Sequence, residues 1–326
     1  MKNTRNFFSI RTEADFNNFA LETFRFQAKN CQVYKDYLHF LNIRPDQIQT
    51  ISDIPFLPIE FFKSHRVTSA DTVAEQVFSS SGTTGSQTSK HYVSDVSIYE
   101  ESFRRCFNLF YGDTKNVAIL ALLPSYLERT GSSLIYMVDD LIKSSHCPES
   151  GYFLYNHDEL YENLVALQAE KTPTILFGVT YALLDFTEQY QLAFPELIIM
   201  ETGGMKGRRK EIIRQELHET LCAGFGVPSI HAEYGMTELL SQAYSKGKGL
   251  FACPPWMKIM IRDMNDPFSY QVAGISGGIN IIDLANINSC SFIATQDLGR
   301  MQIDGRFEVL GRFDQSDVRG CNLMIQ

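Results

Sequence analysis

The stretch NVAILALL (residues 116–123) decides the fold class. It is a short, continuous apolar run, and such a run is typical of a strand buried on both faces of a parallel sheet. A helical pattern follows at 132–143, and a second apolar strand is expected at 174–177. Strand, helix and strand in this order predict an α/β fold with a mostly parallel sheet covered by helices.

The alternation extends in both directions from this stretch. Further strands are expected at 197–200 and 229–232, and further helices at 12–40, 158–169 and 210–221. The last part of the chain changes character, because strands at 257–261, 278–284, 291–294 and 306–310 are separated by Gly and Asp turns. We therefore expect one domain over residues 1–326, with an α/β body at 1–250 and a β-rich subdomain with a short C-terminal tail at 251–326.

The composition excludes several classes of protein. Of the 326 residues, 44% are hydrophobic, which is enough for a packed core, and the net charge of -9 disfavours binding to nucleic acid. No apolar run approaches the ~20 residues that cross a bilayer, and no signal peptide precedes the first helix, so we expect a cytoplasmic protein without an integral membrane segment. The seven cysteines are dispersed and form no CxxC pair, which disfavours structural zinc and a disulfide framework.

The segment FSSSGTTGSQTSK (residues 78–90) is the densest local signal in the chain. Glycines let successive backbone N–H groups point at one anion, hydroxyls donate further hydrogen bonds, and the closing lysine supplies the opposite charge. The segment lacks the second glycine of a Walker A loop. A solvated, Ser-rich turn is the alternative interpretation. The candidate phosphate-binding residues are Ser80, Ser81, Gly82, Thr83, Thr84, Gly85 and Lys90.

Three later segments, together with this loop, carry a family resemblance. YGMTE at 234–238, TQD at 295–297 and GRFD at 311–314 are similar to the Y-G-x-T-E, T-G-D and G-R-x-D motifs of the adenylate-forming enzymes, and they occur in that family's order. Within this superfamily, PSYLER at 124–129, GGMKG at 203–207 and RGC at 319–321 look most like the LuxE-type acyl-protein synthetases. Those proteins activate a fatty acid and transfer it to a protein cysteine.

The resemblance implies a role for each matching residue. Tyr234 would place its ring on the adenine of ATP beside Gly235, and Asp297 would accept both ribose hydroxyls. Arg312 would reach the ribose and the α-phosphate, Glu238 would hold Mg²⁺ on the phosphates, and hard cations do prefer carboxylate oxygen. The other expected residues are Thr237 in catalysis and Gly203 and Gly204 in the wall of the adenine and acyl pocket. The alternative interpretations are a buried strand-end aromatic for Tyr234, a helix first-turn acid for Glu238, and a turn residue for Asp297.

The sequence also departs from the superfamily pattern. Most members carry a C-terminal domain with a catalytic lysine, whereas this sequence ends at residue 326 and its last lysine is Lys258. Lys90 and Lys206 are therefore the first candidates for the cation that stabilises the adenylation transition state. Cys321 lies two residues beyond Arg319, and a nearby guanidinium favours the thiolate, so Cys321 is the candidate acyl acceptor. An ordinary terminal cysteine is the alternative.

These observations lead to an expected reaction with two steps. A carboxylic acid, by resemblance a fatty acid, reacts with MgATP to give acyl-AMP, and Cys321 then takes the acyl group as a thioester. By the same resemblance the partner is an acyl-accepting protein similar to an acyl-CoA reductase. Two alternatives remain, namely a ligase that uses CoA or a carrier-protein thiol directly, and a non-catalytic nucleotide-binding scaffold.

Overall fold

The computed structural model describes residues 6–69, 73–80, 88–124, 131–203 and 212–313. In these residues, one large mixed sheet runs through the molecule in the order β11-β12-β13-β14-β10-β9-β8-β7-β6-β4-β5, with β1 added beside β13, and β2 and β3 form a separate hairpin. The strands are β1 (Leu57–Pro58), β2 (Gln76–Ser79), β3 (Lys90–Val93), β4 (Ala118–Leu122), β5 (Gly151–Phe153), β6 (Thr174–Gly178), β7 (Ile198–Glu201), β8 (His231–Tyr234), β9 (Ala243–Ser245), β10 (Leu250–Ala252), β11 (Met257–Arg262), β12 (Ser276–Asp283), β13 (Phe292–Met301) and β14 (Phe307–Arg312).

Helices cover both faces of this sheet. The α-helices are α1 (Glu13–Asn30), α2 (Gln32–Phe40), α3 (Phe61–Ser64), α4 (Val96–Tyr111), α6 (Ser133–Ser144), α7 (His157–Glu170), α8 (Thr180–Gln189) and α9 (Arg214–Phe225). Short 3-10 helices are η1 (Asn6–Ser9), η2 (Pro45–Gln47), η3 (Ile51–Asp53), η4 (Thr114–Asn116) and η5 (Leu284–Asn286). None of the helices in the described part of the chain is both long enough and apolar enough to span a bilayer.

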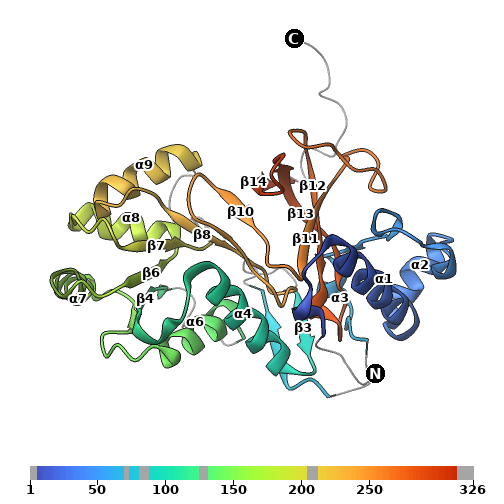
Figure 1. Ribbon diagram of the computed structural model, residues 1–326, viewed down its shortest axis with the longest axis horizontal. Coiled ribbons are helices and arrows are strands. Elements are labelled where there is room, and N and C mark those ends of the chain that lie inside the picture. The colour runs from blue at the N-terminus through green and yellow to red at the C-terminus, as the bar shows by residue number, and fades with distance from the viewer. Residues whose placement is uncertain (1–5, 70–72, 81–87, 125–130, 204–211, 314–326) are drawn as a thin grey trace, which may run out of the picture.

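The strands β5, β4, β6, β7 and β8 are parallel neighbours. Every residue of β4 and β6 is buried, because helices pack on both faces: α8 and α9 lie on one side of these strands, and α4 and α6 on the other (Figure 1). This double coverage explains why both strands read as continuous apolar runs in the sequence. The predicted parallel α/β sheet is confirmed.

The sheet changes direction after β8. The pairings of β8 with β9, and onward through β10, β14, β13 and β12 to β11, are all antiparallel. Buried and partly exposed residues alternate along β11, as expected for a strand with one covered face. The four strands predicted in the last part of the chain are present, although β13 runs to Met301, well beyond the predicted end at residue 294.

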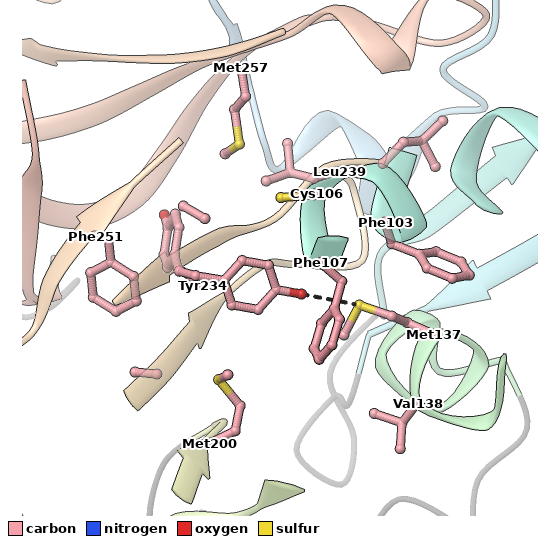
Figure 2. Packing of buried hydrophobic residues seen from close by; sticks show 14 of the residues in the cluster. Phe103, Cys106, Phe107, Met137, Val138, Met200, Tyr234, Leu239, Phe251 and Met257 are labelled. Carbon is pink, nitrogen blue, oxygen red and sulfur yellow. Dashed lines mark hydrogen bonds between the residues drawn. The ribbon is translucent and has the colours of Figure 1, made fainter. Parts of the chain in front are cut away.

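An aromatic and sulfur-rich core supports the strands at this change of direction. Phe103 and Phe107 of α4 and Met137 of α6 lie beside the sheet, as Figure 2 shows. The hydroxyl of Tyr244 on β9 contacts the sulfur of Met137 at 3.8 Å, and the rings of Phe107 and Tyr244 meet edge to face with centroids 6.1 Å apart. This packing holds β8 and β9 in place where the sheet changes from parallel to antiparallel pairing.

Several elements differ from the prediction or were not predicted. The expected helix at 12–40 is two helices, because Cys31 adopts an extended conformation between α1 and α2. The helix expected from residue 210 begins as α9 at Arg214. Helices α4 and α8 were not predicted, although the buried residues of α4 recur at helical spacing. Strands β2, β3, β5, β9 and β10 were not predicted because they are only three or four residues long.

Candidate functional site

The predicted site residues gather where the parallel strands end. Gly203 follows β7 and Gly235 follows β8, so both lie at the carboxyl edge of the parallel strands. This edge is where open α/β sheets bind their ligands. The antiparallel strands β13 and β14 reach the same region, because Asp297 on β13 hydrogen-bonds Tyr234 at the end of β8.

The Ser-rich segment is carried by the hairpin of β2 and β3. Ser79 pairs with Lys90 across the two strands, and the Ser80 amide donates to the carbonyl of Ser89 at 3.1 Å. The hydroxyl of Ser80 in turn accepts from the Ser89 amide at 2.9 Å. Lys90 is exposed at the start of β3. Ser79, Ser80, Ser89 and Lys90 are thus held by the pairing of β2 and β3. Ser81, Gly82, Thr83, Thr84 and Gly85 lie outside the described residues.

Tyr234, Asp297 and Arg312 form a connected polar group. The Tyr234 hydroxyl donates to Asp297 Oδ2 at 2.8 Å, and Arg312 Nε donates to Asp297 Oδ1 at 3.1 Å. The register of β13 and β14 pairs Asp297 directly with Arg312. Tyr234 and Asp297 are buried, whereas the side chain of Arg312 is 79% exposed. Each carboxylate oxygen keeps a second lone pair, so Asp297 retains acceptor capacity for ribose hydroxyls.

Aromatic rings surround Tyr234 on the antiparallel side. Its ring lies 5.9 Å from that of Phe251 and 5.6 Å from that of Phe307, centroid to centroid. Burial, followed by the nearby Asp297 carboxylate, raises the pKa of Tyr234, so the phenol stays protonated and able to donate. The ring of Tyr234 therefore packs as a buried aromatic at the end of a strand. Its hydroxyl nevertheless belongs to the polar group with Asp297 and Arg312.

Glu238 faces the hairpin from the segment that follows β8. Its carboxyl is buried, and burial raises its pKa. A hydrogen bond with the Ser89 side chain and the charges of Arg312 and Lys63 act in the opposite direction. The segment is a turn rather than a helix at this point, so the interpretation of Glu238 as a helix first-turn acid is wrong. A buried carboxyl beside the Ser89 hydroxyl is instead suited to a cation.

The donor set around Glu238 fits a magnesium ion held largely by a nucleotide. Among the described residues, no three His, Cys, Asp or Glu side chains converge as a metal site. Mg²⁺ commonly uses only one or two protein carboxylates and fills its other positions with phosphate oxygens and water. Glu238 alone is therefore a sufficient protein ligand for a Mg²⁺ ion whose other positions are filled by phosphate oxygens and water.

Sequence reasoning missed the residues that hold the turn containing Thr237 and Glu238. The ring of His91 on β3 is buried, with Nδ1 2.9 Å from the carbonyl of Thr237. Asn286 in η5 donates through Nδ2 to the carbonyl of Glu238 at 2.7 Å. Asp283 at the end of β12 accepts from the amides of the two residues that follow Leu239, at 2.8 and 3.0 Å. Their sequence signal is weak, since none of the three belongs to a recognisable motif and the partners of His91 and Asp283 lie more than 40 residues away.

A second carboxyl at the end of β8 was also missed. Burial raises the pKa of Glu233 to about 7, and the hydroxyl of Thr202 donates to its Oε2 at 3.2 Å. A Cβ atom at position 235 would lie 2.3 Å from Glu233 Oε1. A side chain at position 235 would therefore displace the Glu233 carboxyl from its present position.

The end of β7 supplies the remaining described residue of the predicted set. Gly203 has a φ of 76°, a left-handed conformation that glycine adopts without strain. Its carbonyl lies 2.8 Å from the hydroxyl of Thr180, which is also 2.6 Å from Glu201 Oε1. Gly204, Lys206 and Cys321, three further residues of the predicted set, lie outside the described residues.

Comparison with solved structures defines the class of protein. An open conformation of 2-hydroxyisobutyryl-CoA ligase with 2-HIB-AMP and CoA matches at a TM-score of 0.66 and 9% identity, covering 94% of this chain and 72% of the ligase. ATP-bound MatB from Rhodopseudomonas palustris matches at a TM-score of 0.55 and 17% identity, covering 72% of this chain and 47% of MatB. The luciferase-like enzyme of the mealworm Zophobas morio matches at a TM-score of 0.51 and 16% identity, covering 74% of this chain and 59% of that enzyme. The fold is that of the adenylate-forming enzymes, although the chain spans only about half the length of MatB.

A family model narrows this class. The model described as "Acyl-protein synthetase, LuxE" matches residues 8–326. The chain belongs to the LuxE acyl-protein synthetase family, a family of ATP-dependent ligases, as the sequence motifs predicted. A search of curated proteins finds no match to the chain.

Proposed function

We propose that this chain activates a fatty acid with ATP and passes the acyl group to a cysteine thiol. The carboxylate oxygen attacks the α-phosphate of ATP, pyrophosphate leaves, and acyl-AMP forms. A thiolate then attacks the acyl carbon, AMP leaves, and a thioester results. Residues 1–326 act as one adenylating unit in this proposal. The observation that carries it is the convergence of Tyr234, Asp297, Arg312 and Glu238 beside the Ser-rich hairpin.

The geometry supports a division of tasks among these residues. Asp297 and Tyr234 would bind the nucleoside, because the buried carboxylate accepts from ribose hydroxyls and the ring offers a flat apolar face. Arg312 is exposed beside Asp297 and can reach an α-phosphate oxygen, where a guanidinium stabilises developing charge. Bound Mg²⁺, held by Glu238, would neutralise charge on the phosphates.

The roles that we propose for the remaining candidate residues come from the family resemblance. The hydroxyls and amides of residues 80–85 would hold the β- and γ-phosphates, and Lys90 or Lys206 would add a cation at the transition state. Thr237 would donate to a phosphate oxygen, and Gly203 and Gly204 would form the wall between adenine and the acyl chain.

Cys321 is the proposed acceptor of the acyl group, for delivery to a partner similar to an acyl-CoA reductase. The six cysteines in the described part of the chain are free thiols, as expected in a reducing compartment. We accordingly place the reaction in the cytoplasm.

Two assays test the two steps separately. Fatty-acid-dependent exchange of pyrophosphate into ATP is expected for step one, and the absence of exchange across a range of chain lengths would refute it. For step two, labelled fatty acid and ATP are expected to give a hydroxylamine-sensitive label on the protein that Cys321→Ser abolishes. Cys147→Ser is the control, because Cys147 is a free thiol that is only partly buried. A label that persists in Cys321→Ser, or a product formed on free CoA instead, would identify a different acceptor.

A further inference from the structure

His91 joins two segments that lie far apart in the sequence. It stands on β3, directly after Lys90, and its Nδ1 lies 2.9 Å from the carbonyl oxygen of Thr237, 146 residues away. A carbonyl oxygen can only accept, so Nδ1 carries the hydrogen and donates it. The imidazole therefore ties the strand that closes the Ser-rich hairpin to the turn that carries Glu238.

The surroundings of His91 fix its ring and keep it neutral. The ring is 1% exposed, and Phe62 on α3 packs against it edge to face with centroids 5.7 Å apart. Burial lowers the pKa of His91 to about 4, while the Thr237 backbone and the Asn286 side chain, the polar groups that face it, act in the opposite direction. The neutral ring has one N–H to donate, and Thr237 receives it.

Two further contacts hold Glu238 itself, one on its backbone and one on its side chain. Its own carbonyl accepts from Asn286 Nδ2 at 2.7 Å, and its carboxyl meets the side chain of Ser89, two residues before His91. The hairpin thus touches the turn at two points, through Ser89 on the carboxyl and through His91 on the preceding carbonyl.

We propose that His91 is a positioning residue that holds the turn of Thr237 and Glu238 in register with Ser89 and Lys90 at the start of β3, so that both segments contact the same nucleoside triphosphate. The inference rests on the proposed function, because it concerns the binding of MgATP. It assigns no contact between His91 and the nucleotide. The adenosine end of the ligand, which meets Tyr234 and Asp297, should be indifferent to His91.

The test compares nucleotide affinities in His91 variants by calorimetry, without a carboxylic acid. His91→Phe and His91→Leu fill the buried site with apolar side chains of two different shapes and remove the N–H donor. His91→Asn instead places an amide N–H at the same number of bonds from the backbone as Nδ1. We expect the first two to weaken MgATP binding roughly fivefold, the value of one lost hydrogen bond. AMP binding should be unchanged, and His91→Asn should restore MgATP affinity.

Each other outcome has a definite meaning. Equal weakening of MgATP and AMP in a variant whose thermal unfolding is still cooperative would overturn the positioning role, and so would unchanged MgATP binding in both donor-free variants. Wild-type protein that binds neither nucleotide would instead refute the proposed function itself. His39→Leu, at an exposed histidine on α2, is the matched control and should behave as wild type.

Discussion

At the residue scale, hydrogen bonds between side chains on three strands hold the polar group of Tyr234, Asp297 and Arg312 together. Tyr234, Asp297 and Arg312 could be predicted, because each lies in a short pattern of the adenylate-forming enzymes. Their mutual hydrogen bonds could not, since the sequence gives no distance between Asp297 on β13 and Tyr234 on β8. Nor does a pattern mark Glu233, whose altered acidity comes entirely from its burial.

Glu233 gives a prediction about stability and pH. Its pKa is about 7 in the folded protein against an ordinary value of 4.5, so between these values the folded state holds a proton that the unfolded state has lost. Its contribution to stability is therefore greatest below pH 4.5 and falls as the pH rises through 7. The Glu233→Gln variant has no titrating group at this position, so its free energy of unfolding does not fall in this way. At pH 8 the pKa shift corresponds to a difference of up to about 3 kcal/mol in the free energy of unfolding between the variant and wild type.

Urea unfolding of wild type and Glu233→Gln between pH 5 and pH 8 measures this effect. The difference between the two proteins isolates Glu233 from other titrating groups, including His91 and His231, whose pKa values burial lowers to about 4. Glu216→Gln on the exposed face of α9 is the control and should show no such trend. A constant difference between wild type and Glu233→Gln across this range would contradict the prediction.

At the scale of elements, the long and strongly apolar strands were predictable and the short connecting ones were not. The continuous burial of β4 and β6 left a clear sequence pattern. Strands β9 and β10, which carry the sheet from its parallel to its antiparallel half, are three residues each. A strand of that length shows no periodicity, and its pairing is decided by tertiary contacts.

The end of β12 gives a prediction at this scale. The buried carboxylate of Asp283 accepts from the amides of Leu240 and Ser241, from the Ser241 hydroxyl at 2.6 Å and from the Ala285 amide at 3.1 Å. It thereby fixes the turn after β8 to the antiparallel strands. Asp283→Asn replaces one acceptor oxygen by a donor that faces buried donors, so we expect the free energy of unfolding to fall by about 3 kcal/mol.

Chemical denaturation measures the change, with Asp263→Asn as the control. Asp263 also accepts from two backbone amides, at 2.7 and 3.1 Å, but in a more exposed turn. Water can replace its hydrogen bonds, so the control should lose less than about 1.5 kcal/mol. Equal losses in the two variants would show that burial adds nothing to the role of Asp283.

At the scale of the whole molecule, the parallel and antiparallel halves are joined by more than the sheet. Gln27 on α1 is fully buried and donates to the carbonyls of Asn286 and Ile287 at 3.0 Å each, and its Oε1 accepts from the Ser291 amide at 2.9 Å. The N-terminal helices are therefore tied to the antiparallel half, while α4 packs beside the change of direction in the sheet (Figures 1 and 2). The hydrogen bond from Trp256, just before β11, to Ser102 on α4 links the two halves directly. Such links favour unfolding of both halves together.

Trp256, the one tryptophan in the sequence, allows this cooperativity to be tested. Its Nε1 lies 3.1 Å from the hydroxyls of Ser102 on α4 and of Ser241 in the turn after β8, and its ring meets that of Phe8 edge to face with centroids 4.9 Å apart. Its fluorescence therefore reports on the junction, whereas far-UV circular dichroism reports on all elements. We expect both signals to give the same urea midpoint in wild type, because the two halves share one core. Gln27→Leu should move both midpoints down together, since it leaves buried carbonyls and an amide unpaired at a cost of about 2 kcal/mol. A tryptophan transition that separates from the circular dichroism transition would show that the junction opens before the halves unfold, and residues 1–326 would then not behave as one unit.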